Sequence, residues 1–95
     1  MGTDQRQAAQ QRLNDLIAAV QGKPELDRLR EEAEALGRAI AAFHLEGIRF
    51  RIYNVDRLVT HSTAPVPAEA ASIVADVRKH LEAAGFHTRS HQAPG

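Results

Sequence analysis

The chain has 95 residues, a formal net charge of zero, 43% hydrophobic residues and no cysteine. This length allows one domain, residues 1–95, and the lack of cysteine excludes disulfides and thiolate metal sites. The neutral charge argues against a strong nonspecific nucleic-acid binder. Alanine supplies 17 residues, against 22 for Leu, Ile, Val and Phe together. Because alanine buries little area, we expect association with a second chain to help stabilise the fold.

The N-terminal segment is polar and has no apolar run behind a basic start. This pattern does not match a signal peptide, and the longest apolar stretch is far short of a membrane span. We therefore expect a cytoplasmic protein without membrane contact.

Helical spacing dominates the first half of the chain. Residues 4–21 carry an apolar stripe at steps of four, three and four, and Gly22 can end this helix in the left-handed conformation. A second helix should open at Pro24, carry a heptad stripe and end at Gly47. The short link between them predicts an antiparallel helical hairpin over residues 4–46.

The two stripes of this hairpin predict a homodimer. Pairing two hairpins into a four-helix bundle would bury both stripes at once. The predicted dimer seam consists of Leu13, Leu16, Val20, Leu29, Leu36, Ile40 and Phe43.

The apolar period changes after the hairpin. Residues Ile48–Tyr53 alternate between apolar and polar, which predicts a strand, and Arg57–His61 predicts a second one. After a loop with two prolines, Pro67 opens a helix that Gly85 ends, and residues 86–90 can form a third strand. The fold class predicted is α+β: the helical hairpin, then a β-β-α(-β) layer over 47–91, with 92–95 a frayed tail.

The outer face of this small sheet is the predicted contact surface. Arg49, Arg51 and Tyr53 would share it, and Arg57 and Arg89 could join them. Arginine beside tyrosine on an open sheet can hold phosphates and stack bases, but it also suits acidic groups on a partner protein.

No motif in the sequence predicts a catalytic residue, a cofactor or a metal ion. The histidines lack cysteine or clustered carboxylates beside them, and no glycine-rich loop offers a phosphate cradle. The expected function is therefore a small non-enzymatic binding or regulatory protein that acts through protein–protein interaction as a homodimer. The alternative is a nucleic-acid-binding regulator that uses the arginine-bearing sheet face.

Overall fold

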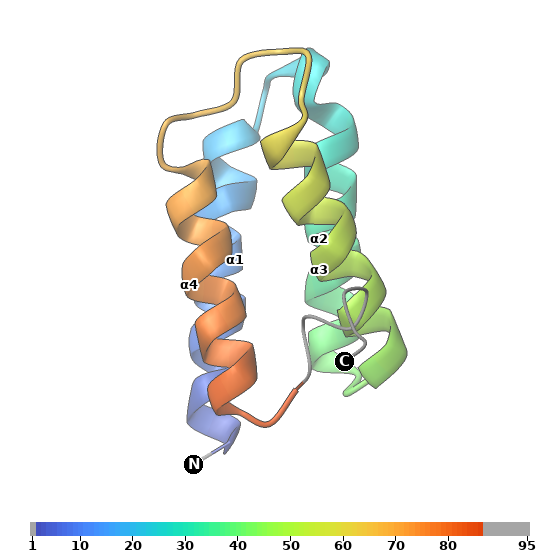
Figure 1. Ribbon diagram of the computed structural model, residues 1–95, viewed down its shortest axis with the longest axis vertical. Coiled ribbons are helices and arrows are strands. Elements are labelled where there is room, and N and C mark those ends of the chain that lie inside the picture. Colours follow the sequence, from blue (N-terminus) through green and yellow to red (C-terminus); the bar gives the residue numbers. More distant parts are fainter. Residues whose placement is uncertain (1, 87–95) are drawn as a thin grey trace.

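The computed structural model of the chain describes residues 2–86, and these form helices joined by short links and by one longer loop, residues 61–69 (Figure 1). In chain order they are α1 (Gly2–Val20), the short 3-10 helix η1 (Pro24–Leu26), α2 (Asp27–Ala41), α3 (Leu45–Thr60) and α4 (Ala70–Ala83). Within the described residues there is no strand, so the predicted α+β class is wrong and the fold is a four-helix bundle.

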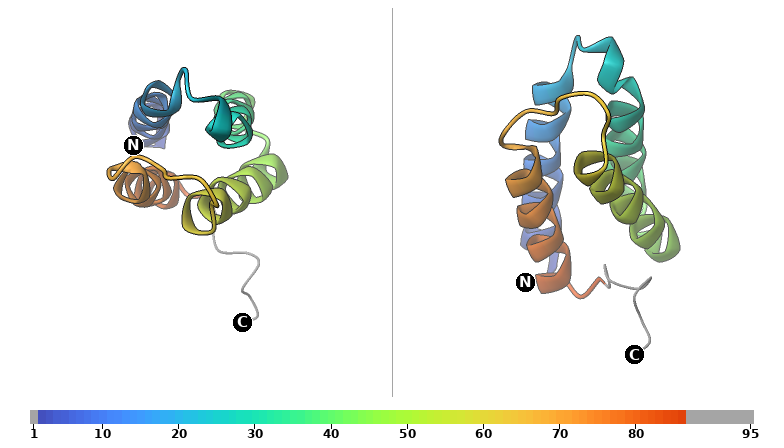
Figure 2. Two further views of the ribbon diagram at one scale, coloured as in Figure 1. Left: turned by 90° about the horizontal axis from the view of Figure 1, so that it is seen from above. Right: turned by 45° about the horizontal axis from the view of Figure 1, so that its top comes forward.

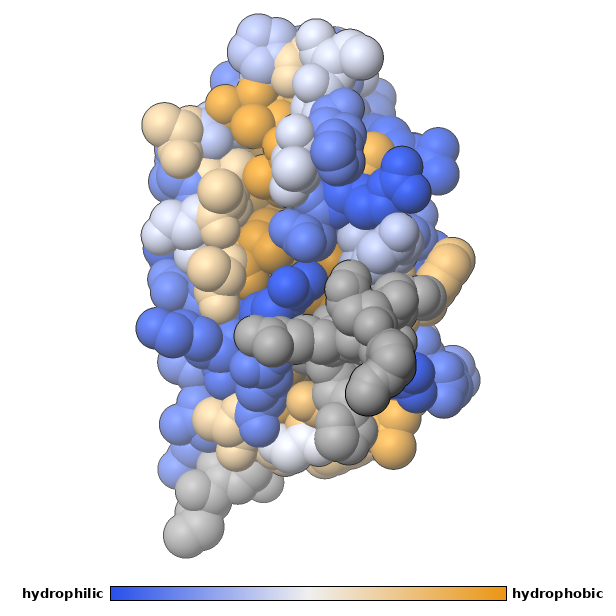
Figure 3. Space-filling view, in the orientation of Figure 1, coloured by the Kyte–Doolittle hydropathy of each residue, from blue (hydrophilic) through white to orange (hydrophobic). Residues whose placement is uncertain are grey.

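The four helices run alternately up and down around a ring. Seen from above in Figure 2, each helix occupies one corner, and α1 lies between α2 and α4. The most extensive packing joins α1 to α4 and α2 to α3, whereas α3 and α4 contact each other least among the helices that are neighbours in the ring. Figure 3 shows apolar surface along the upper part of this α3–α4 seam.

The two predicted N-terminal helices are present as α1 and α2, although the second is shorter than predicted. Their apolar stripes are buried from Ala9 on α1 to Ile40 on α2, and Gly22 has a φ of 75° at the end of α1. The pattern was readable because both stripes keep helical spacing over four or more positions and no alternating pattern competes with them.

The predicted strand Ile48–Tyr53 is wrong, because this segment lies inside α3. The residues buried along this helix follow one another at steps of four, three and four, namely Ile48, Ile52, Val55 and Val59. Phe50 created the apparent alternation, and its side chain is half exposed, on the opposite side of α3. The second predicted strand, Arg57–His61, belongs to the last turn of the same helix and its C-cap. A stripe that extends over twelve residues outweighs an alternation that extends over six.

The predicted end of the second helix at Gly47 is also wrong. Helix α2 ends at Ala41, and Gly47 lies in the first turn of α3. Glycine is needed there for close approach rather than for its conformational freedom, because an added Cβ would collide with Nδ1 of His44.

The predicted third helix is confirmed by α4, although it begins at Ala70 rather than at Pro67. Its stripe from Ala70 to Leu81 is buried. Gly85 ends the helix with a φ of 97°, and the ring of Phe86 returns to the core with 7% exposure. Apart from Phe86, the predicted third strand lies outside the described residues, as do Arg89 and the tail 92–95.

The core of the bundle uses almost the whole predicted dimer seam within one chain. Leu13, Leu16 and Val20 of α1 and Leu29, Leu36 and Ile40 of α2 are at most 2% exposed. Helices α3 and α4 provide the apolar stripes against which they pack. The four-helix bundle expected from two chains is thus completed by one chain, and these six residues are not free to contact a second copy.

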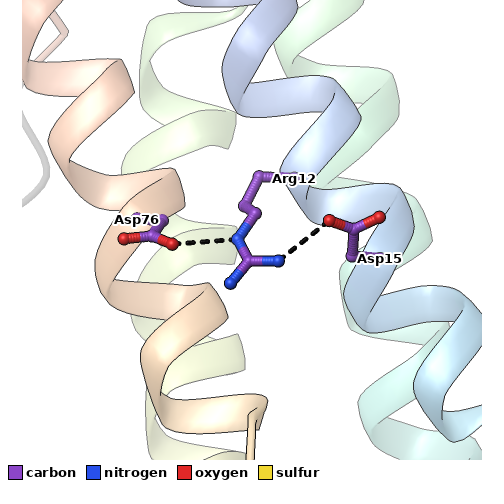
Figure 4. Close-up of polar contacts among 3 residues, drawn as sticks. All are labelled: Arg12, Asp15 and Asp76. Carbon is purple, nitrogen blue, oxygen red and sulfur yellow. Dashed lines mark hydrogen bonds and ion pairs between the residues drawn. The ribbon is translucent and has the colours of Figure 1, made fainter.

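Polar contacts between neighbouring helices fix which faces meet. Arg12 of α1 lies between Asp15 on its own helix and Asp76 on α4, and it donates to each carboxylate over 2.9 Å (Figure 4). The hydrogen bond to Asp15 and, to a smaller extent, the one to Asp76 raise the pKa of Arg12 above its ordinary value. On the far side of the ring, Glu32 of α2 accepts from Arg51 of α3 over 3.0 Å. The Arg12 pairs are half-exposed, and such pairs favour one arrangement more than they add stability.

Candidate functional site

The end of the bundle where α2 turns into α3 is the most exposed apolar part of the described surface. Every residue from Ala41 to Glu46 is exposed, and we call this segment the α2–α3 corner. Phe43 is 57% exposed and Leu45 is 58% exposed. Phe50, one turn further along α3, is 50% exposed. The remaining large apolar side chains of residues 4–86 are buried or half-buried, so this concentration is not a general property of the surface.

Phe43 holds an unusual backbone conformation at this corner. Its φ is 56°, in the left-handed region, where glycine is the usual residue after a helix. Its N–H donates to the carbonyl of Ile40 over 3.2 Å, and the N–H of His44 donates to the carbonyl of Ala39 over 3.0 Å. These two bonds make a Schellman motif, which satisfies the last carbonyls of α2. A non-glycine residue in this conformation costs about 1–2 kcal/mol.

Two side chains hold the Phe43 ring. The guanidinium carbon of Arg6, on α1, lies 4.1 Å from the ring centroid, and the Phe86 ring lies at 6.0 Å in a tilted arrangement. Arg6 also donates to the carbonyl of Ile40 over 3.3 Å, which anchors it to the end of α2. Phe43 is therefore positioned from one side while more than half of its surface faces solvent.

His44 fixes the start of α3 and with it the direction of the corner. Its Nδ1 atom accepts a hydrogen bond from the N–H of Gly47 over 2.9 Å, so His44 acts as the N-cap of the helix. A histidine in this role is less common than Ser, Thr, Asp or Asn. With His44 as the cap, Leu45 becomes the first helical residue, and its side chain projects into solvent.

A shallow groove of about 570 Å³ continues from the corner along the outside of α2 and α3. Its α2 wall consists mainly of small side chains, and Phe50 stands on its α3 wall with the Arg51 guanidinium 5.2 Å from the ring centroid. The groove is lined by Ala35, Arg38, Ala39, Ala42, His44, Glu46, Gly47, Phe50 and Arg51.

The predicted contact arginines are not brought together on one face. Because a helix turns about 100° per residue, Arg49 and Arg51 lie roughly 200° apart on α3. Arg49 pairs with Glu46 over 3.1 Å, and Arg51 pairs with Glu32 over 3.0 Å. The geometry that made this pair suitable for neighbouring phosphates required a strand, and the segment is helical.

Tyr53 and Arg57 lie next to each other on the solvent side of α3, and the Arg57 guanidinium lies 5.9 Å from the Tyr53 ring centroid.

Of the predicted dimer seam, Phe43 is the member that stays exposed. Leu45 and Phe50 were not among the predicted contact residues. A helical projection could have found Phe50, because it lies opposite the stripe that begins with Ile48 and Ile52.

Within residues 4–86, no three His, Asp or Glu side chains lie close enough together to hold a metal ion. None of the helices described is long and apolar enough to cross a membrane. No family model matches the chain, and no curated protein or solved structure is significantly similar to it. The α2–α3 corner is thus the feature from which a function has to be argued.

Proposed function

We propose that this chain is a small non-enzymatic binding protein that acts by contact with another protein at the α2–α3 corner, with the cytoplasm as its expected location. The observation that carries the proposal is the exposed Phe43 in a left-handed conformation. Residues in such conformations tend to persist at functional sites, where the stability they cost is offset elsewhere.

The type of residue supports the same conclusion. A glycine at position 43 would complete the Schellman motif without strain, as Gly85 does at the end of α4. The chain instead carries an aromatic side chain there, held by Arg6 and Phe86 and still 57% exposed. Aromatic anchors at the centre of an interface commonly supply much of its binding energy.

The chemistry of the corner indicates the kind of partner surface. Phe43 and Leu45 are two exposed apolar side chains two residues apart on the same corner, and such side chains suit an apolar pocket or groove. Arg6 lies over one face of the Phe43 ring and adds a positive charge beside it. We therefore propose a protein partner with an apolar pocket bordered by a carboxylate.

Site-specific photocross-linking in the source cell tests this proposal. A photoreactive phenylalanine derivative at position 45 should give a discrete adduct with one partner protein. The same derivative at the exposed position 72 of α4 is the matched control and should not give it. Phe43→Ser in the position-45 protein should abolish the adduct. Equal adduct patterns from positions 45 and 72, or an adduct that Phe43→Ser leaves unchanged, would refute the proposal.

A further inference from the structure

The outer face of α2 carries a second regular pattern, separate from the stripe that packs in the core. Its members follow one another at steps of three, four, three and four, and each is exposed or half-exposed: Arg28, Glu31, Ala35, Arg38 and Ala42. Because α2 occupies a corner of the ring (Figure 2), this face lies away from the core, and part of it borders the groove toward α3. The spacing is that of a helix-packing seam, with one small residue, Ala35, at its middle.

Glu31 and Arg38, which like Arg28 on the same face lack a counterpart among the described residues, are the charges nearest the middle of this face. Neither forms an ion pair or a side-chain hydrogen bond with any other residue of the described chain. They are seven residues apart, which places them on the same side of α2, two turns from each other. Their midpoint falls between positions 34 and 35, half a residue from Ala35.

We infer that a second copy of this chain binds to this face, with its α2 antiparallel to the first and the two-fold axis beside Ala35. In that arrangement Glu31 of each copy faces Arg38 of the other. Two symmetry-related Glu31–Arg38 ion pairs then form across the interface. A two-fold interface must be complementary to itself, and the position of these two charges about Ala35 meets that condition. The small Ala35 side chain allows the two helices to approach closely.

Phe50 supplies the apolar part of the same interface. Along the α2–α3 pair, Gly47 lies against Ala39, and Arg51 lies against Glu32. Phe50 is therefore level with the segment around Ala35, next to the proposed axis, and it lines the same groove as Ala35 and Ala39. The half-exposed Phe50 ring of one copy can pack over the small-residue wall of the other copy's groove.

The remaining charges near the axis do not oppose this pairing. Glu34 would approach its own equivalent, but Arg30 already neutralises it over 3.3 Å. Arg28 would face the C-terminal end of the other copy's α2, where the helix dipole favours a positive charge. The arrangement thus brings no two unpaired like charges together.

This interface does not involve Phe43 or Leu45, so it goes beyond the proposed function and either can fail alone. Sedimentation equilibrium of the full chain should show a monomer–dimer equilibrium at micromolar concentration. Glu31→Arg or Arg38→Glu alone should weaken the dimer at least tenfold. Because the chain carries both charges, the double variant Glu31→Arg with Arg38→Glu should restore the dimer to within about threefold of the original.

A cysteine-crosslinking experiment locates the axis. The chain has no native cysteine, so Ala35→Cys should oxidise readily to a disulfide-linked dimer, whereas Ser72→Cys on α4 should not. The thermal unfolding of each variant checks that the exposed substitutions leave the fold intact. A wild-type chain that stays monomeric up to millimolar concentration would overturn the inference. So would a double variant no better than the single ones, or equal crosslinking at positions 35 and 72.

Discussion

Two helix ends in this bundle share a left-handed backbone but carry very different residues. After α1 the residue is Gly22, with a φ of 75°, and nothing lies within 4 Å of the place where its Cβ would be. After α2 the residue is Phe43, with a φ of 56° and a ring held by Arg6 and Phe86. The first end only turns the chain. The second does the same at a cost of about 1–2 kcal/mol and presents an aromatic side chain, which is the basis of the proposed function.

The proposed role of Phe43 requires that the segment after it is a helix rather than a strand. Ile52→Ala should reduce the free energy of unfolding by about 2–5 kcal/mol, because Ile52 is fully buried. Phe50→Ala should reduce it by only about 0.5 kcal/mol, because Phe50 lies on the exposed side of α3. Chemical denaturation at low protein concentration measures both. A strand would place the two residues on the same face, so losses of similar size would contradict the helical assignment.

Gly22→Ala measures the cost of the left-handed backbone at the end of α1. The added methyl group meets no neighbour, so the loss of stability should come from the left-handed backbone alone, at about 1 kcal/mol. Denaturant unfolding of this variant against the original chain gives the value. A variant as stable as the original would mean that the left-handed conformation costs nothing in this bundle, and the argument from Phe43 would then fail.

At the end of α2, where Phe43 is strained, a change to glycine should relieve the cost of the left-handed backbone. Phe43→Ala and Phe43→Gly both lose the contacts to Arg6 and Phe86, but only glycine relieves the strain. Phe43→Gly should therefore be more stable than Phe43→Ala by about 0.5–1 kcal/mol. In an ordinary helical position alanine is the more stable of the two. A higher unfolding midpoint for Phe43→Ala than for Phe43→Gly would therefore contradict the strain at this position.

The smallest effect concerns the cap that follows Phe43. Gly47→Ala should lower stability by about 0.5 kcal/mol, because the new methyl group displaces His44 from its hydrogen bond to the N–H of residue 47. At an exposed helical site without such a contact, the same change usually adds stability. Thermal unfolding can measure the sign, and a more stable variant would show that the His44 cap contributes little.

The pattern that predicts α1, α2 and α4 is local, because each helix shows one stripe at one period. In α3 two patterns overlap, and Phe50 completes an alternation with Ile48 and Ile52 although its side chain faces solvent. The sequence also could not tell that the stripes containing Leu13 and Leu36 would be covered by α3 and α4 instead of by a second chain. Which surfaces cover a stripe depends on tertiary packing, and periodicity carries no information about it.

The candidate site was harder to predict than the fold, for a related reason. Glycine is the usual signal for a helix end, so Gly47 suggested the wrong residue, and Phe43 was read as one more member of a buried stripe. Its exposure follows from the Schellman motif formed by Phe43 and His44, which has no recognisable sequence pattern when its left-handed residue is not glycine.

Whether Phe43 serves partner contact at a cost in stability can be tested in one variant, Phe43→Gly with the photoreactive residue at position 45, by measuring both its unfolding midpoint and its partner adduct. If Phe43 is kept for binding at the expense of stability, the variant should unfold at or above the midpoint of Phe43→Ala and give no partner adduct. A variant that unfolds well below Phe43→Ala and still forms the adduct would contradict the account, because Phe43 would then serve the fold and not the contact.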